Sequence, residues 1–149
     1  MTEPSVRGTK HLLVVEDDPG DVLLTREALA GTSTPLDVHV VEDGEAAVDF
    51  LRRVGGHGDA PRPDLVLLDL NLPRLDGREV LAHIKSDAGL RSIPVVVLTT
   101  SKSDEDVRRS YELHANAFVT KPVELDHFLS VVRQVGEFFL TVVQLPTHG

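Results

Sequence analysis

The sequence has no cysteine, so it can form neither a disulfide framework nor a cysteine-based zinc site. No stretch approaches the ~20 apolar residues that a membrane span requires. Residues 1–10 are polar and lack the apolar segment of a signal peptide, and we expect them to form a flexible N-terminus. These absences predict a cytoplasmic protein that does not associate with a membrane.

Basic side chains are also few. The chain of 149 residues has 15 Lys and Arg against 24 Asp and Glu, which gives a net charge of -9. This charge opposes attraction to phosphate backbones, and no basic stripe is present, so nucleic-acid binding is not expected. Neither G-x-x-x-x-G-K-[ST] nor G-x-G-x-x-G occurs, which argues against a nucleotide-binding enzyme.

The chain contains five short apolar segments, separated by residues that begin or end helices. The run 65–68 has no polar alternation, which is typical of strands covered on both faces in a parallel sheet. Asp18, Asp76 and Ser103 stand where capping residues begin helices, the last two with an acidic residue at capping-box spacing. Strands are expected at 11–15, 36–41, 65–68, 95–99 and 116–120, and helices at about 19–30, 44–54, from 77, at 103–114 and from 124.

This order predicts one α/β domain, a (βα)5 doubly wound parallel sheet of the flavodoxin-like kind with strand order 2-1-3-4-5. Polar side chains end four of the strands: Glu16 and Asp17, then Asp69, Thr99 and Lys121. Because the carboxyl ends of parallel strands meet at one edge, we expect these side chains to lie together. Taken singly, each has an ordinary structural explanation, such as a helix cap or a solvated charge. Their recurrence at strand ends favours a functional site.

Three carboxylates without counter-charges repel each other, so such a cluster usually holds a cation. All-oxygen ligands suit a hard ion, and Mg2+ needs only one or two carboxylates with waters and phosphate oxygens. A carboxylate can also carry a phosphoryl group, with a metal, a lysine and a hydroxyl stabilising the transferred charge. The predicted edge contains all of these groups.

With these residues, the sequence resembles the receiver domains of response regulators in two-component signalling, over residues 11 to about 135. The matching motifs are VVEDD, LLDLNLPRLDG, PVVVLTTS and VTKP. The resemblance implies that a partner histidine kinase phosphorylates Asp69. It also implies that Mg2+ is held by Asp17, Asp69 and the backbone carbonyl of Asn71, while Thr99 and Lys121 bind the phosphoryl oxygens.

Two positions depart from the common receiver pattern. Glu16 replaces an aspartate, which leaves open whether it contacts the metal directly or through water. Phe118 stands where many receivers have a tyrosine that swings inward. The resemblance implies signalling through the face formed by the fourth helix, fifth strand and fifth helix, with Phe118 filling the space that Thr99 vacates. A plain core aromatic is the alternative for Phe118.

More narrowly, the chain is similar to the small regulators that serve phytochrome-type light-sensing kinases. This resemblance rests on the blocks APRPDLVLLDLNLPRLDGREVL and SYELHANAFVTKPVE and on the lack of an output domain. It implies a phytochrome-type histidine kinase as the partner.

Two other functions compete with this interpretation, a haloacid-dehalogenase-like phosphatase and a phosphate sink or relay intermediate. The phosphatase usually has a second aspartate two residues after its nucleophile, where this chain has Asn71, which cannot exchange a proton in that way. A relay would use one of seven histidines, of which His39, His57 and His148 are predicted as exposed strand, loop and tail residues. We therefore do not expect an enzyme.

We expect residues 136–149 to form a C-terminal extension of the last helix and a tail, with no output domain. One apolar stripe should cover the sheet, and a second predicts a two-fold homodimer through the last helix and the extension. The alternative is that the segment FFLTVVQL folds back over its own subunit, perhaps under the 55–63 loop. The first stripe is Leu125, Phe128, Leu129, Val132 and Phe139, and the second is Val131, Val135, Phe138 and Val142.

Overall fold

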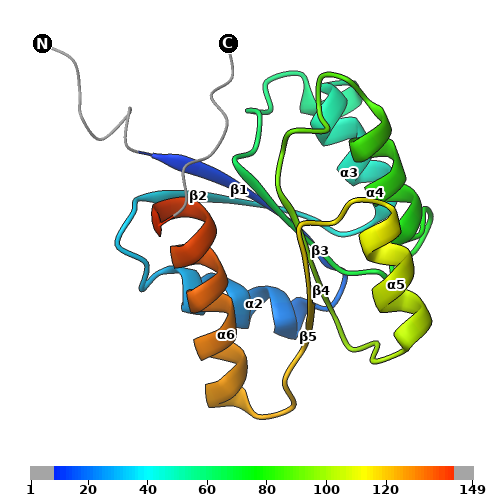
Figure 1. Ribbon diagram of the computed structural model, residues 1–149. Helices are drawn as coiled ribbons and strands as arrows, with labels where there is room; N and C mark the ends of the chain where they lie inside the picture. The colour runs from blue at the N-terminus through cyan, green and yellow to red at the C-terminus, as the bar shows by residue number, and fades with distance from the viewer. Residues whose placement is uncertain (1–8, 143–149) are drawn as a thin grey trace, which may run out of the picture.

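The computed structural model describes residues 9–142, which form one five-stranded parallel sheet flanked by helices (Figure 1). The strand order is β2-β1-β3-β4-β5, as predicted. The order in which the chain adds strands therefore reverses between β1 and β3. At such a switch point the carboxyl ends of the strands in an open α/β sheet form a crevice. The strands are β1 (Lys10–Val15), β2 (Leu36–Val41), β3 (Leu65–Leu68), β4 (Val95–Thr99) and β5 (Ala117–Thr120).

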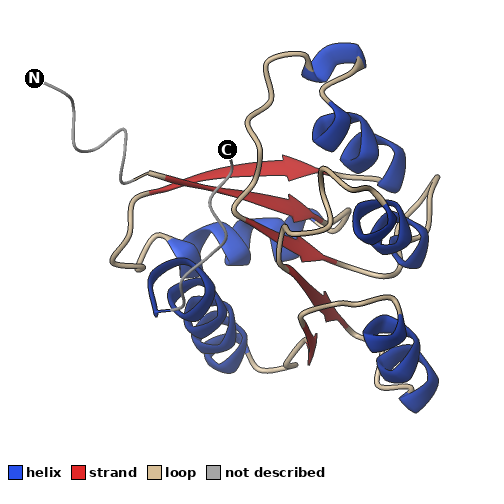
Figure 2. Ribbon diagram, turned by 45° about the horizontal axis from the view of Figure 1, so that its top comes forward, coloured by secondary structure: helices blue, strands red, loops and turns tan. Residues whose placement is uncertain are grey.

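The helices cover both faces of the sheet (Figure 2). Helices α2 and α6 pack on one face, and α3 and α4 pack on the other, with α5 beside β5. The bounds are α2 (Pro19–Leu29), α3 (Gly44–Arg52), α4 (Gly77–Ser86), α5 (Asp104–Glu112) and α6 (Leu125–Glu137), with a 3-10 turn η1 (Gly55–His57) and a π-helical turn η2 (Phe138–Val142).

The central strands are buried on both faces, which explains their unbroken apolar sequences. Leu13 and Val15 of β1 face α3 and α4, whereas Leu12 and Val14 face α2 and α6. All four residues of β3 are buried. The core is thus two apolar layers with the sheet between them, and the strands are fixed up to their carboxyl ends.

The predicted capping residues begin the helices. Asp18 accepts from Gly20 N at 2.8 Å, Asp76 from Arg78 N at 2.7 Å, and Ser103 from Asp106 N at 3.3 Å. At Ser103 the reciprocal half of a capping box is replaced, because the Asp106 carboxylate binds Ser101 and Arg78 instead.

The last helix differs from its prediction at its first turn. Phe128 and Val132 of α6 are buried, but Leu125 is 54% exposed, so the prediction that it covers the sheet is wrong. Leu125 is the first residue of α6, two residues after the almost fully exposed Val123, and the buried residues of the helix begin at Phe128. Phe138, in the second stripe, is half exposed.

The η2 turn folds back on its own subunit, which was the alternative for this segment. Leu140 is buried between α2 and α6. Thr141 Oγ1 lies 2.7 Å from Thr34 Oγ1, so the turn packs at the 31–35 loop and not under the 55–63 loop. The other end of the described chain is adjacent, because Lys10 N donates to Pro35 O at 3.0 Å. Val143 and the residues after it lie outside the described part.

Two histidines are less exposed than predicted. His39 and His57 are half-buried in a row of rings, His11, His39, Phe50 and His57, with centroid separations of 5.4, 5.5 and 5.6 Å. His39 is on an edge strand, but Phe50 of α3 covers it. His148 lies outside the described residues.

Candidate functional site

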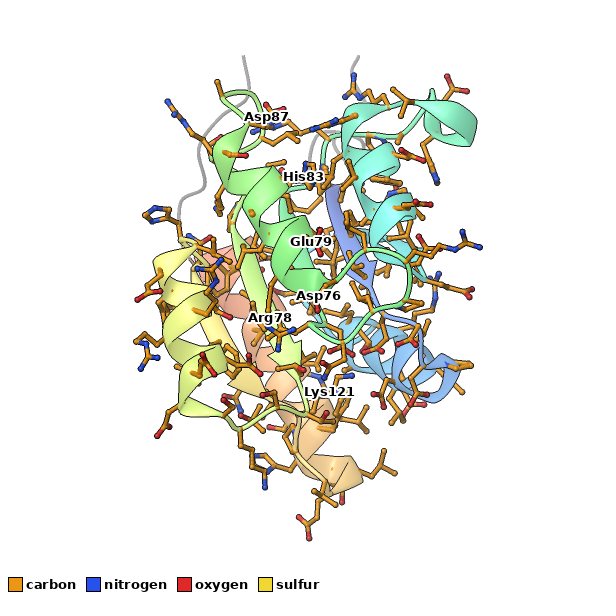
Figure 3. The ribbon with its side chains drawn as sticks, turned by 90° about the vertical axis from the view of Figure 1, so that its right-hand side faces the viewer. Asp76, Arg78, Glu79, His83, Asp87 and Lys121 are labelled. Carbon is orange, nitrogen blue, oxygen red and sulfur yellow. The ribbon has the colours of Figure 1, made fainter. Side chains whose placement is uncertain are left out.

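The carboxyl ends of β1, β3 and β5 bring three predicted site residues into direct contact. Glu16, Asp69 and Lys121 are each more than 90% buried. Lys121 Nζ lies 2.5 Å from Glu16 Oε1 and 3.2 Å from Asp69 Oδ2. In Figure 3, Lys121 lies below the first turn of α4, at this edge of the sheet. The topological prediction is therefore confirmed for these three side chains.

Backbone hydrogen bonds fix these residues because the sheet ladder continues one residue past each strand. Glu16 N donates to Val41 O at 3.0 Å, Asp69 N to Val15 O at 3.1 Å, and Lys121 N to Thr99 O at 2.7 Å. The backbone hydrogen bonds of the sheet thus position the site residues, which suits a site that depends on precise position.

A fourth charged residue, Asp21, belongs to the site, and the sequence analysis missed it. Its Oδ2 lies 2.8 Å from Lys121 Nζ. Asp21 is in the first turn of α2, three residues after the Asp18 cap, where an acidic side chain normally serves the helix N-terminus. The only sequence signal was this spacing, which does not distinguish a helix-stabilising acid from a site residue.

Three carboxylates therefore share one ammonium group. Burial raises the pKa of Glu16 to about 7, although the hydrogen bond and the charge of Lys121 act in the opposite direction. Burial opposes the charge on Lys121, but hydrogen bonds to Asp21 and Glu16 outweigh it and raise its pKa above the ordinary lysine value. Lys121 thus stays protonated, and the site carries an excess of negative charge.

This excess fits a divalent cation. One carboxylate oxygen from each of Glu16, Asp17 and Asp69 lies within 4.8 Å of the other two. Asp17 is exposed, and the other two residues are buried. The donors are all oxygen, as hard cations require, and the exposed side leaves room for water or phosphate oxygens. The residues present fit a bound divalent metal.

Asn71 and Thr99 lie at the edges of this cluster. Asn71 N donates to Asp69 Oδ1 at 3.2 Å, so the two oxygens of Asp69 have different partners. Thr99 is fully buried at the end of β4, and its Oγ1 accepts from Ser101 N at 3.5 Å. Asp64, by contrast, lies at the opposite edge and accepts from His11 N at 2.8 Å.

Glycine is required where α4 approaches Asp69. A Cβ on Gly77 would lie 2.2 Å from Asp69 O, and Gly77 N donates to Leu70 O at 2.9 Å. The first turn of α4 is therefore fixed against the backbone that carries Asp69.

The sequence profile of the response regulator receiver domain matches residues 12–133. The chain belongs to the response regulator receiver family. Response regulator Rcp1 of Synechocystis sp. is 46% identical over 137 residues, which cover 92% of this chain and 93% of Rcp1. With the family assigned, the haloacid-dehalogenase alternative is not favoured.

Solved structures of similar receivers agree with this assignment. The structure of the phosphorylated cyanobacterial phytochrome response regulator RcpA superposes with a TM-score of 0.90 at 47% identity, over 93% of this chain and 99% of RcpA. The Mn2+-bound form of Rcp1 superposes with a TM-score of 0.89 at 46% identity, over 93% of this chain and 99% of Rcp1. Within the described residues of this receiver, no helix is both long enough and apolar enough to cross a membrane.

Proposed function

We propose that this receiver is a single-domain response regulator that accepts a phosphoryl group on Asp69 from a histidine kinase, in a reaction that requires Mg2+. The observation that carries the proposal is the 3.2 Å separation between Lys121 Nζ and Asp69 Oδ2 inside the carboxylate cluster. The similar RcpA structure, which is that of a phosphorylated phytochrome response regulator, supports the proposal.

In the proposed reaction, a carboxylate oxygen of Asp69 attacks phosphorus in a phosphohistidine. A P–O bond forms, the P–N bond breaks, and the histidine nitrogen leaves with the electron pair. Lys121 is placed to neutralise the phosphoryl oxygens. The Thr99 hydroxyl donates to another of them once it turns away from Ser101 N, which now donates to it at 3.5 Å.

We infer that the metal ligands are Glu16, Asp17, Asp69 and the backbone carbonyl of Asn71. A Mn2+-bound form of the similar regulator Rcp1 is known, which supports binding of a divalent ion by this receiver. When bound, Mg2+ would neutralise the charge that accumulates on the carboxylate and phosphoryl oxygens. Glu16 already binds Lys121, so it links the metal to the ammonium group, either directly or through a water.

The partner kinase must reach Asp69 from the exposed side of the site. Asp21 and Lys121 form an ion pair. Leu23, two residues after Asp21, is 66% exposed, and Val123, two residues after Lys121, is 97% exposed. We propose that these apolar side chains flank the entrance and contact the kinase. The similarity to Rcp1 and RcpA favours a phytochrome-type kinase, and a cytoplasmic location remains part of this proposal.

Two further parts of the proposal concern output. Signalling would use the face formed by α5, β5 and α6, with Phe118 moving when Thr99 turns. Homodimerisation would use the last helix and the extension. Phe138 is half exposed and supports the dimer, whereas the burial of Leu140 leaves less apolar surface for it.

Phosphorylation is tested with a small-molecule phosphodonor and intact mass measurement. The wild type should gain one phosphoryl group with Mg2+ and none in the presence of a chelator, and Asp69→Asn should gain none. A phosphorylated peak in the variant would reject Asp69 as the acceptor. Steady release of phosphate from a generic phosphomonoester would favour a phosphatase instead.

The dimer is tested by light scattering. A point substitution is preferable to a truncation of the C-terminal segment, because truncation would remove the buried Leu140. Phe138→Glu should dissociate a dimer that uses this surface. Val123→Glu, two residues before α6 begins, should leave the dimer intact. In a separate assay, Val123→Glu should slow phosphotransfer from the kinase. A wild-type monomer at micromolar concentrations would reject the dimer.

A further inference from the structure

The loop between β4 and α5, residues 100–103, is held by hydrogen bonds to Ser101. Its hydroxyl donates to Asp106 Oδ2 at 2.6 Å, and its carbonyl accepts from Thr120 Oγ1 at 3.4 Å. Its amide donates to Thr99 Oγ1 at 3.5 Å. Ser101 therefore connects Thr99 Oγ1, through its amide, to the Asp106 carboxylate, through its hydroxyl.

Asp106, which receives the Ser101 hydroxyl, is bound from the other side by Arg78. Arg78 Nη2 lies 2.7 Å from Asp106 Oδ1, and Arg78 Nε donates to the same oxygen at 3.1 Å. The Ser101 hydrogen bond and the Arg78 guanidinium together lower the pKa of Asp106. Arg78, labelled in the first turn of α4 in Figure 3, thus joins α4 to α5 and, through the Asp106 carboxylate, to the loop.

The α4 end of this connection packs closely against the backbone that carries Asp69. Arg78 follows Gly77, whose Cα has no room for a side chain against Asp69 O. Asp76 also fixes the guanidinium, at 3.0 and 3.1 Å from Nη1 to its two oxygens. A movement of the loop toward Asp69 would therefore strain the Arg78–Asp106–Ser101 connection or shift α5.

We propose that Arg78 and Asp106 act as positioning residues for phosphorylation, forming a latch that holds Ser101 and restrains Thr99 from turning to the phosphoryl group. This inference rests on the proposed phosphorylation of Asp69. The latch sets the cost of closing the loop, so it tunes how readily the receiver is phosphorylated without contacting the reacting atoms. Removing Arg78 frees Asp106 and lowers that cost.

The test is the rate of Asp69 phosphorylation by a small-molecule phosphodonor at saturating Mg2+. Arg78→Gln should raise the rate about two- to fivefold, the range expected when a partly exposed ion pair is lost. The matched control is Arg74→Gln, which removes the same charge from the preceding loop, where Arg74 pairs with Asp43 and Glu45 and is 65% exposed. The control should stay at the wild-type rate.

A double-mutant cycle tests the connection itself. Arg78 and Ser101 are joined through Asp106, so Arg78→Gln in a Ser101→Ala background should give no further increase. Additive effects would overturn the latch, as would an Arg78→Gln rate equal to or below that of the wild type. If Arg78→Gln does not fold, Arg78→Lys replaces it, because lysine keeps the charge but cannot make the two-nitrogen contact. Arg78→Lys should raise the rate less than the range given for Arg78→Gln. No increase in the rate would overturn the latch.

These outcomes separate the two proposals. A wild type that is not phosphorylated at Asp69 rejects the proposed function. A wild type that is phosphorylated, with Arg78→Gln indistinguishable from Arg74→Gln, rejects only the latch.

Discussion

The two edges of the parallel sheet differ in how their polar side chains are paired. At the amino edge, donors and acceptors are matched: Asp64 accepts from His11 N, and Asn116 Oδ1 accepts from Val95 N at 2.8 Å and from Lys85 Nζ at 3.2 Å. At the carboxyl edge, Lys121 faces the carboxylates of Glu16, Asp21 and Asp69.

The difference is one of charge balance rather than of burial. The amino edge is complete without any added group, so its polar side chains contribute to folding. The carboxyl edge has a surplus of negative charge that an added cation can balance, so part of its interaction energy becomes available only when a ligand binds. Substitutions at the two edges should therefore have different signatures.

The largest effect is expected when Lys121 is replaced. Lys121→Met leaves buried carboxylates without their counter-charge, which should lower the free energy of unfolding by about 3–5 kcal/mol at pH 8. The loss should be smaller at pH 6, because a carboxyl group with a raised pKa takes up a proton there. Urea unfolding at both pH values measures this, with the exposed Lys102→Met as the control. Equal losses at the two pH values would contradict the charge-balance argument.

Metal binding should stabilise the protein through the carboxyl edge alone. Mg2+ at a hundredfold excess over its dissociation constant should add about 2.7 kcal/mol to the free energy of unfolding. Asp17→Asn should lose most of this gain, and Asp64→Asn should keep it. Because the Glu16 pKa is raised to about 7, its proton competes with the metal, and affinity should increase from pH 6 to pH 8. Stabilisation that persists in Asp17→Asn would place the metal elsewhere.

At the amino edge, loss of one amide should cost stability and leave the chemistry unchanged. Asn116→Ala removes the acceptor for Val95 N–H, at the start of a buried strand, and should lower the free energy of unfolding by about 1–3 kcal/mol. The phosphorylation rate of Asp69, measured below the unfolding transition, should equal that of the wild type. A slower reaction would show that the two edges are coupled.

The smallest effect concerns the histidine row. Burial, together with the neighbouring His11, lowers the pKa of His39. The unfolded chain then binds the proton more readily than the folded chain. The contribution of His39 to the free energy of unfolding is therefore fully present above the ordinary histidine pKa of about 6.5 and is lost as the pH falls below it. His39→Gln should flatten the dependence of the melting temperature on pH between 7.5 and 5.5. The exposed His127→Gln should leave that dependence unchanged, and an unchanged slope in His39→Gln would assign it to other groups.

The sequence predicted what depends on repeated local patterns. Unbroken apolar runs located β3 and β4, capping residues located the helix starts, and parallel topology then brought Glu16, Asp69 and Lys121 to one edge. It did not predict Asp21, because an acid in the first turn of a helix already has a local explanation. Leu125 was misjudged because helical spacing does not tell which turn extends past the core.

The pairing of Arg78 with Asp106 could not be predicted either. The two residues are far apart in sequence, and their contact depends on how α4 and α5 lie relative to each other. Thr99 shows a third kind of limit. Its position at the end of β4 was predictable, but its hydrogen bond with Ser101 N depends on the conformation of the 100–103 loop.

The contacts of Lys10 and Thr141 with the adjacent residues Pro35 and Thr34 have a practical consequence. Both ends of the described chain meet beside the start of β2, at the edge of the sheet opposite Asp69. A short linker could therefore join them, and new ends could be opened in a surface loop such as 55–63. A fluorescent reporter or an immobilisation tag joined at these two ends of the described chain would start at the edge opposite Asp69, so kinase binding could be followed without blocking the site.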